Sequence, residues 1–300
     1  MYEIKNKNIS VIITDFNRMN YINYALSSLP IDNDIETILV TNIEEDKIKN
    51  DKIKMTYIYN KGETYGDMLR VAIQESKGDI ICFLEDDDIF SPDKIKYIKK
   101  IFNSSPETSY YHNSYFRIDD FGKQIGIEQN KEKISFLPFK NSKELKKIMN
   151  RNVDHNLSSI TVNKRYINSS ELVTLSRINL SVDTYMFAIS LKEGTKLIDD
   201  NSLLTGYRIH DSTSNPNKKT SPENPYLRLH EMYSKDYKIS SNITENSYFK
   251  DFLNCRYKIE KLYYSAHRKR HILQNTIDCL PCIKYLDIIT IKNRVKMFIK

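Results

Sequence analysis

A short apolar run that ends in consecutive acids constrains this chain more than any other feature. The segment 79–92 reads DIICFLEDDDIFSP, so five apolar residues are followed by four acids, Glu85 to Asp88. Such a run, bounded by charge, is typical of a strand buried on both faces. Adjacent carboxylates repel one another and raise each other's pKa unless a cation compensates them. The segment therefore predicts a cation site at the end of a buried strand, with a solvated acidic loop as the alternative.

The surrounding segments predict a parallel α/β arrangement. Apolar residues recur at helical spacing from Tyr65 to Ile73, and Ser91-Pro92 is typical of an N-cap followed by the first helical position. Earlier segments predict strands at 10–14, 37–41 and 55–59 and a helix at 22–29. Alternating strands and helices favour a parallel sheet covered by helices, and such sheets bind ligands at the carboxyl ends of their strands.

Several of these segments together resemble family 2 glycosyltransferases of the GT-A fold. The resemblance rests on 10–18, 60–62, 78–79, 83–88 and 91–93, and more faintly on 182–183 and 207–210. It implies a GT-A-like (Rossmann-like), mostly parallel sheet with helices on both faces. It also implies an enzyme that transfers a sugar from a nucleoside-diphosphate sugar to an acceptor hydroxyl, with inversion of the anomeric configuration.

The resemblance implies a nucleotide site near the first strands. Thr14 and Phe16 match the loop that holds the base, where Phe16 offers a stacking surface, and Asp86 matches a residue directed toward the ribose. An acid pair of the family is replaced by Thr41 and Asn42. Because the Asn42 amide can both accept and donate hydrogen bonds, the identity of the base stays open.

The resemblance implies a divalent metal, Mn²⁺ or Mg²⁺, at the four acids Glu85 to Asp88, which form the acid loop. The matching ligands are Asp87 and Asp88, with His210 joining from a later motif. Arg208, in the same motif, matches a residue that binds the diphosphate. Such metals take one or two carboxylates and leave positions for phosphates, and neutral imidazole suits Mn²⁺.

Asp183 matches the general base that deprotonates the acceptor in inverting enzymes. The family's preceding acid is replaced by Val182, and capping of the following helix is the alternative role for Asp183. His112, Asp154 and His155 lie where the family builds its acceptor pocket.

Composition limits the partners and the location. The 300 residues carry a formal net charge of +7, and the basic residues are dispersed without a nucleic-acid motif. Nucleotide phosphates or anionic lipids are therefore expected, and nucleic acid is not. Four cysteines without an evident signal peptide predict a reducing, cytoplasmic location and no disulfide framework, and no run reaches the length of a membrane span.

The expected organisation is a catalytic domain at 1–214, with a nucleotide-sugar half at 1–105 and an acceptor half at 106–214, then a linker at 215–225 and a helical extension at 226–300. The final residues form a two-faced pattern, with Lys292, Lys296 and Lys300 on one side. Such a helix lies on an anionic membrane, which would suit a glycan or lipid-linked acceptor, or it packs on its own domain.

Two other functions remain open. A sugar-1-phosphate nucleotidyltransferase also uses a parallel sheet and a metal, but a glycine-rich loop would follow its first strand, and the segment 14–17 contains no glycine. An inactive carbohydrate-binding homologue would keep the fold while losing its acids, whereas the acid loop here is intact.

Overall fold

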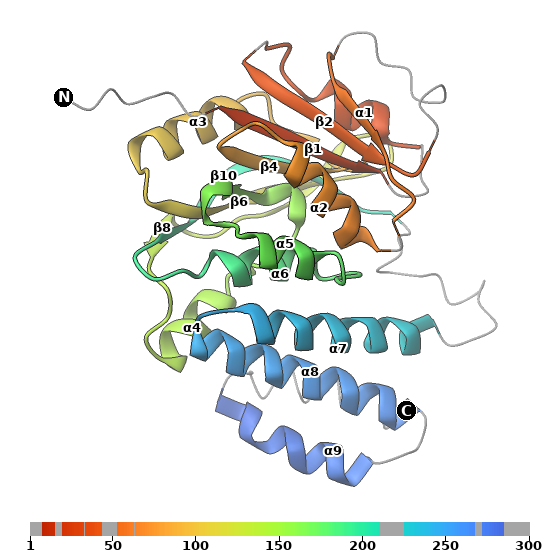
Figure 1. The fold of residues 1–300 in the computed structure, drawn as a ribbon, viewed down its shortest axis with the longest axis vertical. Coiled ribbons are helices and arrows are strands. Elements are labelled where there is room, and N and C mark those ends of the chain that lie inside the picture. The colour runs from red at the N-terminus through yellow and green to blue at the C-terminus, as the bar shows by residue number, and fades with distance from the viewer. Residues whose placement is uncertain are drawn as a thin grey trace.

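A mixed sheet with helices on both faces forms the centre of the molecule (Figure 1). The computed structural model describes residues 8–15, 20–32, 34–43, 53–62, 64–210, 225–267 and 272–284. Phe16, the expected linker before Pro225 and the two-faced segment at the end of the chain lie outside these ranges. Within the described residues the sheet has ten strands, in the order β3-β2-β1-β4-β9-β6-β10-β5, with β7 beside β6 and β8 beside β10.

The first four strands confirm the expected parallel unit. They are β1 (Ile9–Asp15), β2 (Ile35–Thr41), β3 (Thr56–Tyr59) and β4 (Ile80–Glu85). In register, Asp15 lies beside Thr41 and Thr14 beside Glu85. The carboxyl ends of β1, β2 and β4 therefore meet at one edge, where the acid loop begins.

The second half of the sheet is mixed. Its strands are β5 (Ile89–Phe90), β6 (Thr108–Ile118), β7 (Gln124–Glu128), β8 (Ile134–Phe136), β9 (Ile160–Asn163) and β10 (Lys196–Arg208). β10 runs parallel to β6, whereas β9 is antiparallel to β4 and β6 and β5 is antiparallel to β10. A tight turn joins β6 to β7, and only an antiparallel pair permits so short a connection. The β5–β10 pairing brings the end of β10 to the acid loop.

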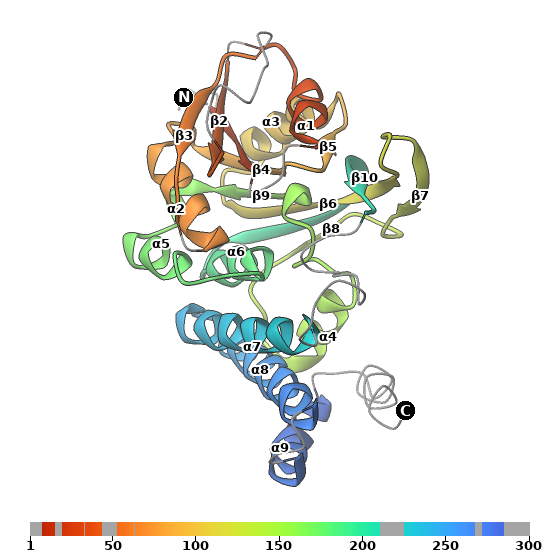
Figure 2. The ribbon, with the colours of Figure 1, turned by 90° about the vertical axis from the view of Figure 1, so that its right-hand side faces the viewer.

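Alternate side chains of the buried strands supply two separate cores. Val11 and Ile13 of β1 pack with α1 (Ile22–Ser27) and α3 (Lys94–Ser104), whereas Ile12 packs on the side of α2 (Tyr65–Glu75) and α6 (Val182–Ser190). This follows from the two-residue period of a strand. Figure 2 shows the two helical layers, with α4 (Ser142–Met149) and α5 (Ser169–Leu175) on the α6 side.

The start of α3 differs from the expectation. The N-cap is Asp93 and the first helical residue is Lys94, so Ser91 is not the cap and Pro92 lies in the preceding turn. The reason is local: the Lys94 N–H donates to the Ser91 carbonyl at 3.0 Å, which closes a turn before the helix begins.

Of the three C-terminal helices among the described residues, the first two share the core of the sheet, and the third packs on the second in a separate small cluster. They are α7 (Pro225–Ile243), α8 (Ser247–His267) and α9 (Ile272–Cys279), and α7 and α8 lie side by side beneath α6 in both views (Figures 1 and 2). Phe249, Phe252 and Leu253 of α8 belong to the same buried cluster as Phe83 and Tyr185. Helices α7 and α8 are therefore packed onto the sheet domain.

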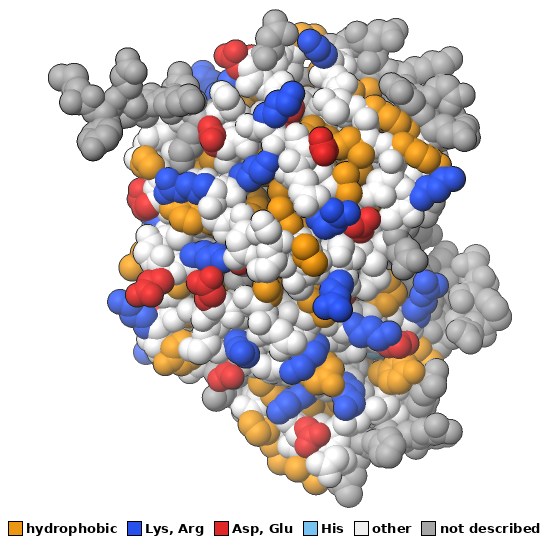
Figure 3. Space-filling view, in the orientation of Figure 1, with side chains coloured by type: hydrophobic (Ala, Val, Ile, Leu, Met, Phe, Trp, Pro, Cys, Tyr) orange, Lys and Arg blue, Asp and Glu red, His pale blue; other side chains and the backbone are white. Residues whose placement is uncertain are grey.

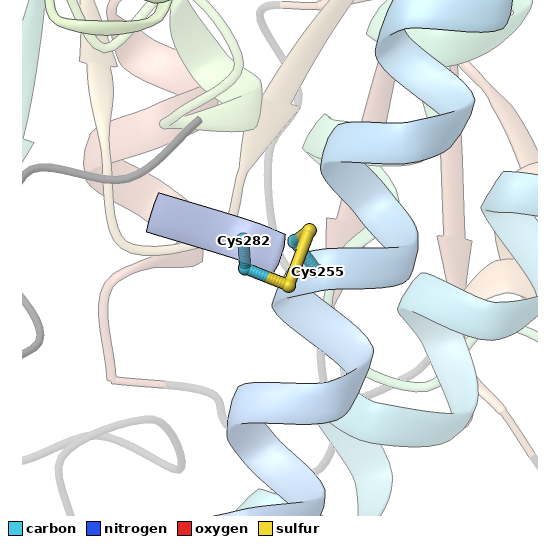
Figure 4. The surroundings of a disulfide bond; sticks show 2 residues. All are labelled: Cys255 and Cys282. Atoms are coloured by element: carbon cyan, nitrogen blue, oxygen red, sulfur yellow. A yellow bond between two sulfur atoms is a disulfide. The ribbon is translucent and has the colours of Figure 1, made fainter. Parts of the chain in front are cut away.

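The expectation that the cysteines form no disulfide is wrong for one pair. Cys255 of α8 is bonded to Cys282, with 5.3 Å between their Cα atoms (Figure 4). Cys82 and Cys279 are free and buried. The short helix η4 (Leu280–Lys284) folds Cys282 back onto α8, so its partner lies 27 residues away rather than at the nearby Cys279.

Charged side chains of both signs are scattered over the face of the molecule seen in Figure 3. Within the described ranges, no helix is both long enough and apolar enough to cross a bilayer.

Candidate active site

Thr14, Tyr65 and Glu85 meet at the strand ends. The hydroxyls of Thr14 and Tyr65 are 2.5 Å apart, and the Tyr65 hydroxyl donates to Glu85 Oε1 at 3.4 Å. Burial raises the pKa of Glu85 well above its usual range, and the charges of Asp87 and Asp88 raise it further. Thr14, expected beside the nucleotide, is thus buried with its hydroxyl facing Tyr65.

Two other expected nucleotide residues lie at this edge. Asn42 directly follows β2 and is half-buried. Asp86 is buried, and its N–H donates to the Thr14 carbonyl at 3.1 Å, which ties the acid loop to β1. The parallel strands therefore bring Asn42 and Asp86 to the same edge of the sheet, on either side of β1.

Asp87 and His210 converge although 123 residues separate them. His210 Nε2 lies 2.7 Å from Asp87 Oδ2, and the Tyr21 ring packs 5.1 Å from the imidazole. The β5–β10 pairing explains the approach, because it aligns the chain after β10 with the acid loop. A carboxylate and an imidazole at this separation can bind one divalent ion together.

Asp88 and Arg208 join β10 to the acid loop. The Arg208 N–H donates to Asp88 Oδ1 at 2.9 Å, and Nε and Nη1 donate to the carbonyls of Asp87 and Asp119, both at 2.6 Å. Burial raises the pKa of Asp88 to about 7, with the charge of Asp87 adding to the effect. Asp88, an expected metal ligand, thus also anchors a backbone N–H.

One nitrogen of Arg208 makes no hydrogen bond within the described residues. Its guanidinium lies over the Tyr21 ring at 4.6 Å, and most of its nitrogens donate to loop carbonyls. Nη2 is buried and has no hydrogen-bond partner among the described residues. A buried donor of this kind requires an acceptor, because an unmade hydrogen bond costs about 1 to 3 kcal/mol. A phosphate oxygen would provide that acceptor.

The donor set fits a divalent metal that shares its coordination with a diphosphate. The described part of the chain contains no group of three or more His, Cys, Asp or Glu residues that could hold a metal alone. Asp87 and His210 form a pair instead. Mg²⁺ and Mn²⁺ sites in nucleotide enzymes commonly use so few protein ligands, because substrate phosphates complete the shell.

Asp183 lies in the first turn of α6, two residues after its N-cap, Ser181. Its Oδ1 accepts from the Thr184 N–H at 2.7 Å, and His155 Nδ1 is 3.9 Å from its Oδ2. Its side chain is 22% exposed. Burial raises the pKa of Asp183 to about 6, His155 opposes this shift and Asp154 adds to it. A partly exposed carboxylate with this pKa is suited to act as a base near neutral pH.

The three expected acceptor residues occupy different environments. The side chain of His155 is half exposed, whereas Asp154 is buried and accepts from Thr184 Oγ1 at 3.1 Å. His112 is buried, with Nδ1 2.8 Å from Asp199 Oδ1 and Nε2 3.1 Å from the His155 carbonyl. His112 therefore holds the backbone of His155 rather than facing solvent.

Sequence reasoning missed Tyr21, Tyr65 and Arg256. Tyr21 contacts both Arg208 and His210, and Arg256 of α8 binds Asp154 at 2.7 Å. No local pattern marks them, because the chain contains 21 tyrosines and its 46 basic residues are dispersed. Their roles depend on segments that meet only in the fold.

The chain belongs to glycosyl transferase family 2, because the model of that family matches residues 10–170. This confirms the resemblance to family 2.

Curated relatives include an uncharacterized glycosyltransferase of Nostoc sp., 27% identical over 117 residues, which are 35% of this chain and 36% of the relative. An uncharacterized glycosyltransferase of Rickettsia conorii is 32% identical over 126 residues, covering 39% of this chain and 20% of the relative. The matched regions are thus only about a fifth to a third of each relative's length.

Solved structures of S. aureus TarS share the fold. The crystal structure of TarS 1-349 matches with a TM-score of 0.59 at 12% identity, over 87% of this chain and 73% of TarS 1-349. The complex of TarS 1-349 with UDP-GlcNAc matches with a TM-score of 0.58 at 10% identity, over 91% and 79% of the two chains. The GT-A-like architecture is therefore confirmed.

Proposed function

We propose that this chain is an inverting, metal-dependent glycosyltransferase that moves a sugar from a nucleoside-diphosphate sugar to an acceptor hydroxyl. The observation that carries the proposal is the position of Asp183. Its carboxylate is partly exposed and lies within electrostatic reach of Glu85 at the acid loop. This proximity supports a proposed base that acts beside the proposed diphosphate site. The TarS complexes with UDP and UDP-GlcNAc support a nucleotide-sugar donor.

In the proposed reaction Asp183 accepts the proton of the acceptor hydroxyl. The acceptor oxygen forms a bond to the anomeric carbon while the bond from that carbon to the diphosphate oxygen breaks. The bonding electrons leave with the nucleoside diphosphate, and attack from the opposite face inverts the anomeric configuration. Arg208 Nη2 donates to the diphosphate, which strengthens as an acceptor when its negative charge increases.

Asp87 and His210 are the residues proposed to hold the Mn²⁺ or Mg²⁺. When bound, the metal supplies Lewis-acid stabilisation of the charge on the departing diphosphate. Asp88 and Arg208 keep the loop that carries Asp87 against β10.

We further propose a glycan or lipid-linked acceptor and a cytoplasmic enzyme in peripheral contact with anionic membrane. The four-residue spacing of Lys292, Lys296 and Lys300 in the sequence supports the membrane contact, because each basic side chain near such a surface contributes about 1 kcal/mol. Co-sedimentation with anionic but not neutral vesicles is expected. Equal recovery in the supernatant with both vesicles would contradict the membrane contact.

The reaction is tested with a panel of nucleotide sugars, Mn²⁺ and mixed acceptors. Wild type is expected to release nucleoside diphosphate, whereas a nucleotidyltransferase would consume or release pyrophosphate.

Asp183→Asn is expected to lose about 10²- to 10⁴-fold in transfer while still binding donor. Asp87→Asn is expected to lose the Mn²⁺ dependence of donor binding. Wild-type turnover in Asp183→Asn, or donor affinity indifferent to Mn²⁺ in wild type, would contradict the respective assignment.

A further inference from the structure

Asp236 of α7 binds the loop that leads into the Asp183 helix. Its carboxylate accepts from three successive backbone N–H groups, those of Asn179 at 3.0 Å, Leu180 at 2.7 Å and Ser181 at 3.0 Å. The Ser181 hydroxyl also donates to it, at 3.3 Å. The side chain of Asp236 is fully buried, at 0% exposure. These contacts cross 55 to 57 residues of sequence.

The contact fixes the backbone just before α6. Hydrogen bonds from N–H groups to an ionised carboxylate are shorter and stronger than neutral ones, and in a buried setting they hold a defined geometry. Ser181 is the N-cap of α6, but its own side chain makes no capping bond. The carboxylate of Asp236 therefore fixes the three residues that lead into α6, and the last of them, Ser181, lies two residues before Asp183.

A second contact holds the backbone just after Asp183. The Thr184 hydroxyl donates to Asp154 Oδ2 at 3.1 Å, and Arg256 Nη1 of α8 donates to the same oxygen at 2.7 Å. The Arg256 guanidinium packs 4.6 Å from the Phe252 ring and 5.4 Å from the Tyr237 ring. Both aromatic residues belong to the C-terminal helices, so these helices set the position of the cation.

We propose that the C-terminal helices α7 and α8 are part of the catalytic apparatus, with Asp236 and Arg256 as positioning residues for Asp183. This inference rests on the proposed role of Asp183 as the base. Asp236 sets the path of the chain before Asp183, and Arg256, through Asp154, sets it afterwards. A displacement of a catalytic group by about 1 Å can cost on the order of 100-fold in rate, so such fixation matters.

Arg256 also contributes to the charge around Asp183. Among the described residues, the titratable and charged groups that face Asp183 include His155, Asp154, Arg256, Glu85 and Tyr110. Arg256 lowers the pKa of Asp183, whereas Asp154 raises it. Without Arg256 the negative charge of Asp154 would be uncompensated. Arg256→Gln is therefore expected to move the acidic limb of the pH–rate profile to higher pH.

The decisive variant is Asp236→Asn, because the new amide keeps one acceptor oxygen but directs its N–H₂ at the loop's N–H donors. We expect kcat to fall about 10- to 100-fold while the donor dissociation constant stays within about twofold of wild type. Thr244→Val is the matched control. The Thr244 hydroxyl donates to the Ala188 carbonyl at 3.0 Å, so it links the residue directly after α7 to the C-terminal end of α6, away from Asp183. This control is expected to lower Tm but keep kcat.

A fully active, folded Asp236→Asn would overturn the inference, and so would equal losses of kcat in Asp236→Asn and Thr244→Val. If Asp236→Asn does not fold, the Arg256→Gln variant provides the test. An unchanged acidic limb of its pH–rate profile, together with an unchanged kcat, would also overturn the inference. Asp183→Asn is measured in parallel. Its full activity would refute the base assignment itself, whereas an inactive Asp183→Asn beside an active Asp236→Asn would refute only the positioning role.

Discussion

Environment, rather than residue type, distinguishes the carboxylates of this site. Burial raises the pKa of Asp88 to about 7, yet its Oδ1 accepts from the Arg208 N–H inside the fold. Burial raises the pKa of Asp183 to about 6, but part of its side chain stays exposed. Of these two acids, Asp183 can meet an acceptor and exchange a proton with it.

The acidic limb of the activity profile should report Asp183. A pKa raised to about 6 means that the carboxylate is protonated, and unable to accept a proton, as pH falls through 6. We expect kcat/KM to be level above that pH and to fall about tenfold per unit below it. Residual turnover by Asp183→Asn should lack this limb. A profile that stays flat to pH 5, with Tm unchanged, would contradict the assignment.

At the scale of elements, close backbone approach places α2 against the segment before α6. The Gly66 N–H donates to the Ile178 carbonyl at 3.0 Å. A Cβ at Gly66 would lie 2.0 Å from the Leu175 carbonyl oxygen and 2.8 Å from that of Ile178. Both are backbone atoms, so no side-chain rotation can relieve the clash. Only glycine lets the two segments meet.

Gly66→Ala is therefore expected to destabilise the protein. Alanine improves helix propensity by about 1 kcal/mol, but overpacking costs about 1 to 3 kcal/mol, and the immovable backbone makes the second effect larger. Gly126→Ala is the control, because its nearest contact would be the Arg117 Cδ at an ordinary 3.7 Å. Denaturant unfolding should show a loss for Gly66→Ala only. Equal midpoints for the two variants would show that the elements can separate at little cost.

Over the whole molecule, one apolar cluster joins the sheet to the C-terminal helices. Phe249 of α8 packs against Phe187 of α6 and Phe139, with ring centroids 5.1 Å and 6.3 Å apart. Phe83 of β4 belongs to the same cluster. Because the helices and the sheet bury the same side chains, they should unfold together.

Phe249→Ala tests this cooperativity. Its ring is fully buried, so truncation is expected to cost about 3 to 5 kcal/mol and to lower the single transition at which donor binding is also lost. Phe121→Ala, at a ring that is 86% exposed, should change stability by less than about 0.5 kcal/mol. Two separated calorimetric transitions, with donor binding following only the upper one, would instead define the helices as an independent domain.

The sequence by itself determined the first half of the molecule. The strands β1 to β4, the helices between them and the acid loop follow from two-residue and 3.6-residue periods and from local turn signals. The edge position of Asn42, Asp86 and Asp87 follows too, since the carboxyl ends of parallel strands meet. These features depend on near neighbours in the chain, and so they can be read without the fold.

Only the tertiary structure decided how the distant parts complete the site. Arg208 meets Asp88 across 120 residues, Asp236 meets Asn179 across 57, and Cys255 meets Cys282 across 27. Each contact requires two elements to be packed in one relative orientation, and that orientation results from the summed burial of many side chains. A lone Asp, Arg or Cys in a helix carries no local signal of the partner that packing will bring to it.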